Sequence, residues 1–165
     1  MKIISLIGYS GSGKTYFITR AIQLLKSEFN YNIACIKNVH QHPIDKRGKD
    51  SNLYTEAGAT FSIIKNKFNE HALFIKKELE INTIIKWLEN APIKIDLIFI
   101  ESFRNLNYPS ILCIKDNEEI SPQLTSNVRM ISGIIKPDTF NYKTDIPLID
   151  IELDFQKFLK IFEIG

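Results

Sequence analysis

The sequence has no marked excess of charge of either sign, few cysteines and no long hydrophobic run. Its 21 lysines and arginines nearly balance 19 aspartates and glutamates, and a net charge of +2 is too small for a protein that depends on phosphate-backbone contacts with nucleic acid. Cys35 and Cys113 lie far apart in apolar runs, so we expect two core thiols rather than a disulfide or metal knuckle. The apolar run 3–7 is too short for a signal peptide or a membrane span. We therefore expect a cytoplasmic protein that contacts neither membranes nor nucleic acid.

Hydrophobic periodicity predicts an α/β fold. Short apolar runs predict strands at 2–7, 33–36, 60–64, 72–75, 97–100, 111–114 and 130–135, and helical spacing predicts amphipathic helices at 15–29, 79–88 and 155–162. The polar stretch 38–52 shows no periodicity, and a long irregular stretch in a small domain is usually functional or mobile. Because strands alternate with helices, we expect a mostly parallel central sheet.

One motif carries most of the chemical information. Residues 8–15 read Gly-Tyr-Ser-Gly-Ser-Gly-Lys-Thr and match the phosphate-binding pattern GxxxxGKT, between a predicted strand and a predicted helix. The glycines let backbone N–H groups turn inward around an anion, and the positive end of the following helix points at the same place. We therefore expect residues 1–165 to form a single nucleotide-binding domain, a P-loop NTPase-like three-layer sandwich.

The roles of the motif residues follow from their chemistry. Lys14 reaches the β- and γ-phosphates and is expected to act in catalysis, while the hydroxyl of Thr15 ligates the Mg²⁺ that bridges them. The residues expected to bind the nucleotide are Gly8, Ser10, Gly11, Ser12, Gly13, Lys14, Thr15 and Tyr16.

A phosphate loop normally works with an acid at the end of another buried strand. The apolar run 97–100 delivers Glu101 to the carboxyl end of such a strand, where ligands collect in open α/β sheets. We expect Glu101 to hold Mg²⁺ and to act in catalysis, the alternative being a surface residue that begins a loop. Asp96, at the opposite end, is interpreted as a solvated residue at the strand entry.

The stretch 38–52 leaves several interpretations open. His40 and His42 are suited to binding a metal, to contacting a phosphate or second ligand, or to lying in solvent. Asp45 and Asp50 are suited to contacting Mg²⁺-bound water or orienting an attacking water, although aspartate is also common in turns. Of the two, Asp45 is our candidate catalytic residue.

Asp138 is the candidate that reads the base. It follows the last predicted strand, where a phosphate-loop GTPase places the acid that recognises guanine. A carboxylate can accept hydrogen bonds from both N1–H and the exocyclic amine of guanine, and adenine offers no such pair. Because Asp138 follows Pro137, a plain turn is the alternative.

Beyond the phosphate loop, two stretches make the chain resemble the molybdopterin-guanine dinucleotide biosynthesis protein B family. The first is rich in lysine and histidine, and the second runs from an apolar strand into an acid; both lie within residues 1–115. They comprise residues 36–42, 44–46, 48–51 and 57–59, and then residues 97–104 and Pro109. The chain departs from the family pattern in having Asn38 after Lys37 where a histidine is usual, and Glu-Ser-Phe-Arg at 101–104 where Glu-Gly-Phe-Lys is usual.

The resemblance implies a homodimer that binds GTP and Mg²⁺ and assists a molybdopterin guanylyltransferase, with molybdopterin itself a further candidate partner. It implies slow GTP hydrolysis at most. Two residue-level interpretations agree: we expect no arginine to complete a hydrolytic site at the phosphate loop and Glu101, and the Cβ of Ser102 restricts backbone approach to a γ-phosphate. A small-molecule or nucleoside kinase is the alternative, although such enzymes use several lid arginines and this chain has four scattered ones.

Overall fold

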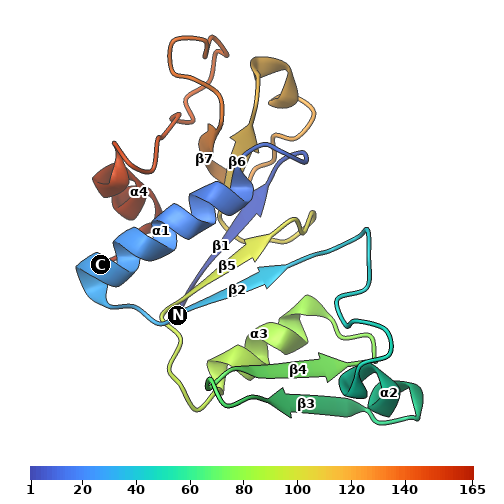
Figure 1. The fold of residues 1–165 in the computed structure, drawn as a ribbon. Helices are drawn as coiled ribbons and strands as arrows, with labels where there is room; N and C mark the ends of the chain where they lie inside the picture. The colour runs from blue at the N-terminus through green and yellow to red at the C-terminus, as the bar shows by residue number, and fades with distance from the viewer. The chain divides into compact units, whose positions relative to one another are not determined.

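The computed structural model describes residues 1–165, which divide into two compact units. The first unit comprises residues 1–38 and 88–165, and the second comprises residues 39–87 (Figure 1). That the whole chain makes one domain stays a prediction. No helix has both the length and the apolar composition needed to cross a bilayer.

A five-stranded parallel sheet forms the centre of the first unit. Its strands lie side by side in the order β2-β5-β1-β6-β7. They are β1 (Lys2–Ile7), β2 (Ile33–Lys37), β5 (Leu97–Glu101), β6 (Ser110–Ile114) and β7 (Val128–Gly133). On one side of β1 lie β5 and then β2, and on the other side lie β6 and then β7. The chain passes from β1 to β2 on the first side, and β6 begins the second side. The loop that follows β1 therefore lies where the strand order reverses. This is the edge where open α/β sheets bind ligands.

The main hydrophobic core lies between one face of this sheet and two helices, α1 (Lys14–Phe29) and α4 (Phe155–Phe162) (Figure 1). Side chains alternate along a strand, so Ile4 and Leu6 of β1 enter this core, whereas Ser5 and Ile7 point to the opposite face. Phe17 and Phe158 make an edge-to-face contact at 5.7 Å in its centre. The predicted α/β fold with a mostly parallel sheet is confirmed.

The second unit consists of α2 (Asp50–Glu56), an antiparallel hairpin of β3 (Phe61–Lys65) and β4 (His71–Ile75), and most of α3 (Ile81–Glu89), which continues past residue 87. The hairpin turn is closed by Asn66, whose Oδ1 accepts hydrogen bonds from the backbone of Phe68 and Glu70. The sequence did not predict α2, because the helix has only seven residues and its buried residues are polar: Ser51, Asn52 and Thr55.

The expectation for one cysteine was wrong. Cys113 in β6 is completely buried, and burial raises the pKa of its thiol to about 12. Cys35, by contrast, is exposed. The apolar run 33–36 suggested a covered strand, but β2 is an edge strand of the sheet, and edge strands have only one neighbour.

Candidate functional site

The phosphate loop connects β1 to the first turn of α1, where its motif predicts it. The backbone at Gly8 and Gly13 has φ of +143° and +92°, which side-chain-bearing residues rarely adopt. At Gly8 a Cβ atom would also lie 2.2 Å from the carbonyl oxygen of Cys113. At Gly13 it would lie 3.1 Å from Cγ2 of Ile134. Glycine is therefore required at both positions to keep the loop closely packed against β6 and the segment after β7.

The side chain of Lys14 turns back over this loop. Its Nζ donates hydrogen bonds to the carbonyl oxygens of Gly8 (2.9 Å) and Tyr9 (2.8 Å), and lies 3.4 Å from Oγ of Ser12. Lys14 is only 7% exposed, and this burial lowers the pKa of its ammonium group. A buried cation held by neutral carbonyls is suited to pairing with an anion brought by a ligand.

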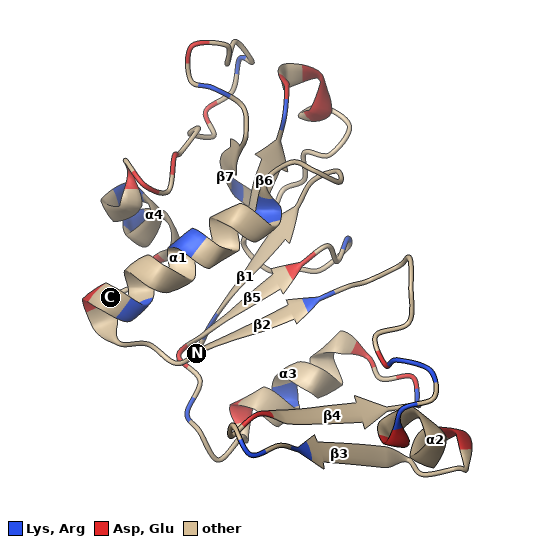
Figure 2. Ribbon diagram, viewed as in Figure 1, with Lys and Arg blue, Asp and Glu red and all other residues tan.

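Three side chains meet beside the loop at the carboxyl ends of β2 and β5. Oγ1 of Thr15 donates to Oε1 of Glu101 at 3.0 Å, and Nζ of Lys37 lies 3.0 Å from the same carboxylate oxygen. Lys37 also donates to Thr15 Oγ1 at 3.3 Å. The strand register pairs Lys37 with Glu101, and Figure 2 shows the basic end of β2 next to the acidic end of β5.

Lys37 is the site residue that motif analysis missed. The sequence indicated Lys37 only by its position directly after a predicted strand. Glu101 was identified by the same kind of position, after another predicted strand. Without the pairing of β2 with β5, however, nothing in the sequence connects residues 37 and 101. Glu101 is 6% exposed, so the lysine compensates a nearly buried carboxylate.

Arg104 lies beside the phosphate loop, where we expected no arginine. Its guanidinium carbon lies 5.4 Å from the centre of the Tyr9 ring, inside the loop, and its Nη2 is 3.4 Å from Oε1 of Gln123. The chain turns sharply after β5, with φ of +66° at Ser102 and +67° at Asn105. This turn brings Arg104 back toward the loop, which sequence distance does not reveal.

Asp138 lies in an exposed turn beyond β7. Asn117, which follows β6, stabilises this turn by donating to the carbonyl of Thr139 at 2.9 Å. A small cavity of about 50 Å³ beside Gly13 is lined by Tyr16, Pro137 and Asp150 among others, and not by Asp138 itself. The base-reading role of Asp138 stays a prediction.

The other acidic and histidine candidates belong to the second unit. Asp45 is 7% exposed; one carboxylate oxygen accepts a hydrogen bond from Ser51 at 2.8 Å, and the other has no partner. His40 and His42 are exposed, and Nδ1 of His42 lies 3.1 Å from the carbonyl of Pro43. The structure contains no group of three or more His, Cys, Asp or Glu side chains arranged to hold a metal ion.

Comparison with known proteins identifies the family. The sequence model of the molybdopterin guanine dinucleotide synthesis protein B (MobB) family matches residues 3–136, which include the phosphate loop, Lys37 and Glu101. The chain belongs to the MobB family. The resemblance seen in the sequence is therefore confirmed, and MobB membership supports a role in molybdenum cofactor biosynthesis.

Curated relatives of this MobB chain carry the same family function in their names. The molybdopterin-guanine dinucleotide biosynthesis adapter protein of Escherichia coli is 25% identical over 154 residues, covering 90% of this chain and 85% of the relative. That of Haemophilus influenzae is 29% identical over 154 residues, covering 90% and 81%. A relative from Methanocaldococcus jannaschii is 29% identical over 150 residues, which are 88% of this chain but only 58% of that protein. This chain thus spans little more than half the length of that relative.

Solved MobB structures have the same fold. A structure of Bacillus subtilis MobB superimposes with a TM-score of 0.77 at 21% identity, over 98% of each chain. A MobB homologue from Bacillus stearothermophilus superimposes with a TM-score of 0.70 at 16% identity, over 99% of this chain and 97% of that one. At these identities the likeness establishes the P-loop NTPase-like fold alone.

Proposed function

We propose that this chain is a GTP-binding adaptor that assists a molybdopterin guanylyltransferase in forming molybdopterin guanine dinucleotide. The observation that carries the proposal is the cluster of Thr15, Glu101 and Lys37 next to a glycine-lined loop with a buried lysine. The names of the relatives supply the pathway, since each describes an adapter in molybdopterin-guanine dinucleotide biosynthesis.

The residues of the loop fit a nucleotide with its magnesium ion. The positive-φ glycines leave a concave backbone, and buried Lys14 adds a charge for the phosphates. The hydroxyl of Thr15 and the carboxylate of Glu101, 3.0 Å apart, are oxygen ligands of the kind that Mg²⁺ prefers, directly or through water. Bound there, Mg²⁺ would supply positive charge to the β- and γ-phosphate oxygens. The full set proposed for the nucleotide is Gly8, Ser10, Gly11, Ser12, Gly13, Lys14, Thr15, Tyr16 and Asp138.

We propose that hydrolysis by the isolated chain is slow. Arg104 stacks on Tyr9 and donates to Gln123, and its guanidinium would have to leave these contacts to reach a transition state on the phosphates. Ser102 occupies a left-handed conformation with its amide donating to the carbonyl of Leu6 at 3.1 Å, so that amide is unavailable to a phosphate. The role of Asp45 in orienting water stays a prediction; within the second unit, one of its carboxylate oxygens has no hydrogen-bond partner.

Base recognition tests the proposal directly. Asp138→Asn is expected to weaken GTP binding by about 10- to 100-fold, because the amide cannot accept both guanine hydrogen bonds. The same variant should gain affinity for xanthosine triphosphate, whose base offers an acceptor where guanine has its amine. Isothermal titration with GTP, ATP and xanthosine triphosphate measures both effects. Asp150→Asn is the matched variant beside Gly13, and a larger loss of GTP affinity there would move the base reader to Asp150. Wild-type preference for ATP would contradict the adaptor proposal.

The hairpin of the second unit supports the proposed homodimer. On one face of this two-stranded sheet, Phe61, Ile63 and Leu73 are 51%, 69% and 49% exposed, and Ile63 pairs across the strands with Leu73. Adjoining exposed apolar side chains of this kind mark protein-interaction surfaces. Ile63→Lys is therefore expected to convert a dimer into a monomer, halving the mass measured by light scattering. Ile44→Lys, at a 77% exposed position outside the hairpin, should leave the mass unchanged. A monomeric wild type, or a dimeric Ile63→Lys protein, would reject this interface.

A further inference from the structure

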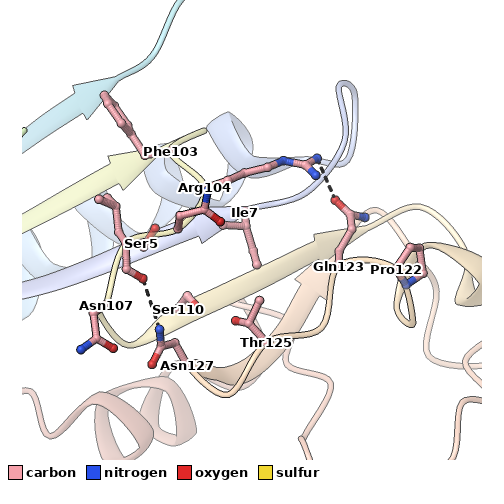
Figure 3. A pocket seen from close by; sticks show the side chains of 12 residues that line it. Ser5, Ile7, Phe103, Arg104, Asn107, Ser110, Pro122, Gln123, Thr125 and Asn127 are labelled. Carbon is pink, nitrogen blue, oxygen red and sulfur yellow. Dashed lines mark hydrogen bonds between the residues drawn. The ribbon is translucent and has the colours of Figure 1, made fainter.

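The first unit contains a second concave site, separate from the phosphate loop. It is a cavity of about 400 Å³ on the face of the sheet that α1 does not cover (Figure 3). Ser5 and Ile7 of β1 and Ser110 of β6 form its floor. The segments 103–107, after β5, and 122–127, before β7, form its walls. Its volume lies in the range of small-molecule sites.

Two buried hydroxyl groups on the cavity floor have no hydrogen-bond partner. Ser5 and Ser110 are 2% and 3% exposed, and neither Oγ atom makes a hydrogen bond. They lie on adjacent strands, directly opposite each other in the register of β1 with β6. Native proteins pair nearly all buried polar groups, because an unpaired one loses its hydrogen bonds to water without replacement. Two such hydroxyls at the bottom of one cavity therefore point to a polar ligand.

The remaining lining narrows the ligand chemistry. Asn107 adds an amide that can both donate and accept, whereas the amide nitrogens of Gln123 and Asn127 already donate to the carbonyls of Glu119 and Leu106. The ring of Phe103 points away from the other lining side chains (Figure 3). Arg104 is the one charged residue of the lining. Two unpaired hydroxyls that can each donate and accept suit a flat heteroaromatic ring with both N–H and C=O groups on its edge, and a single arginine suits one anionic substituent.

Arg104 also connects this cavity to the phosphate loop. Its guanidinium stacks on Tyr9, and Ile7 on the cavity floor immediately precedes Gly8. Nη2 of Arg104 donates to Oε1 of Gln123 at 3.4 Å, and Gln123 is a lining residue of the cavity that is 6% exposed. An anionic group bound at Arg104 would therefore lie next to the loop that we propose binds GTP.

We propose that the cavity binds a pterin, with its 2-amino-4-oxopyrimidine edge on the hydroxyls of Ser5 and Ser110 and an anionic substituent at Arg104. The choice of a pterin rests on the proposed function, in which GTP occupies the phosphate loop and the second reactant is a pterin. The pyrimidine ring of guanine has the same amino and oxo groups on its edge. A guanine nucleotide is therefore the competing ligand for this cavity.

Fluorescence titration with 6-carboxypterin tests the site in the full-length protein. Wild type should bind saturably, and the double variant Ser5→Ala/Ser110→Ala should bind at least tenfold more weakly, because two hydrogen bonds are lost. The variant should keep its melting temperature and its GTP affinity, since neither hydroxyl makes a bond within the protein. Ser62→Ala is the matched control: Ser62 is 3% exposed and also unpaired, but lies in β3. Equal binding by wild type and the double variant, or an equal loss in Ser62→Ala, would overturn the proposal.

Two further titrations distinguish the ligand and the role of Arg104. Arg104→Gln should weaken 6-carboxypterin at least tenfold while leaving neutral 6-hydroxymethylpterin nearly unchanged. GMP should bind wild type and the Ser5→Ala/Ser110→Ala variant with equal affinity. A GMP affinity that depends on these two hydroxyls and exceeds the affinity for 6-carboxypterin would overturn the pterin assignment. Because GTP and carboxypterin are titrated separately, failure of GTP alone rejects the proposed function, whereas failure of carboxypterin alone rejects the cavity site.

Discussion

Lys14→Ala is expected to abolish the stabilisation of this protein by Mg²⁺-GTP while leaving its fold intact. At a GTP concentration of about 100 Kd, wild type should gain about 2.7 kcal/mol in its free energy of unfolding. For a domain of this size that corresponds to a rise of about 5–10 °C in melting temperature. Without Lys14, the loop loses the cation nearest the proposed phosphates, and the rise should disappear. Thermal denaturation with and without nucleotide measures it.

The fold should survive this substitution because of where Lys14 makes its contacts. Its ammonium group reaches only the carbonyls of Gly8 and Tyr9 and the hydroxyl of Ser12, all within the loop. Lys26→Ala is the matched control, since Lys26 lies on the same helix and donates to a backbone carbonyl, that of Tyr31, at 3.1 Å. We expect that variant to retain the full nucleotide-dependent rise. An undiminished rise in Lys14→Ala would reject the phosphate-loop assignment.

Glu101→Gln is expected to remove most of the magnesium dependence of GTP binding. Wild type should bind GTP much more tightly with Mg²⁺ than with a chelator, and the ratio should fall about 10- to 100-fold in the variant, the range for residues that support a bound metal. The glutamine keeps an oxygen for the hydroxyl of Thr15 but loses the charge that attracts the cation and pairs with Lys37. Titration calorimetry in the two conditions gives the ratio.

Glu119→Gln provides the control for the Glu101 experiment. Glu119 is also a nearly buried acid, 8% exposed, and its Oε1 lies 3.3 Å from Nζ of Lys115. It follows β6 rather than β5, and its other oxygen accepts a hydrogen bond from the backbone of Lys115. We expect Glu119→Gln to keep the wild-type magnesium ratio. A loss in this control equal to that in Glu101→Gln would mean that the effect comes from disturbing a buried acid rather than from the metal site.

The sequence predicted well the elements whose side chains repeat with a clear period. The four apolar residues of β5 before Glu101 and the amphipathic pattern of α1 predicted their structures closely. It failed at α2, where buried Ser51 and Thr55 are polar, and at Cys35, where an apolar run belongs to an edge strand. Periodicity reports which side chains are apolar, whereas these cases depend on which neighbours a segment has.

By itself the sequence determined the conformation of the glycine-rich loop 8–15, because that conformation is local: its glycines set the backbone, and Lys14 and Thr15 begin the helix that follows directly. The tertiary structure alone decided what surrounds it. Pairing of β2 with β5 brings Lys37 to Glu101, the turn after β5 carries Arg104 to Tyr9, and pairing of β1 with β6 sets two unpaired serines side by side. Parallel strands that are adjacent in a sheet can be distant in the chain, so contacts at their ends and faces are determined by strand order and register.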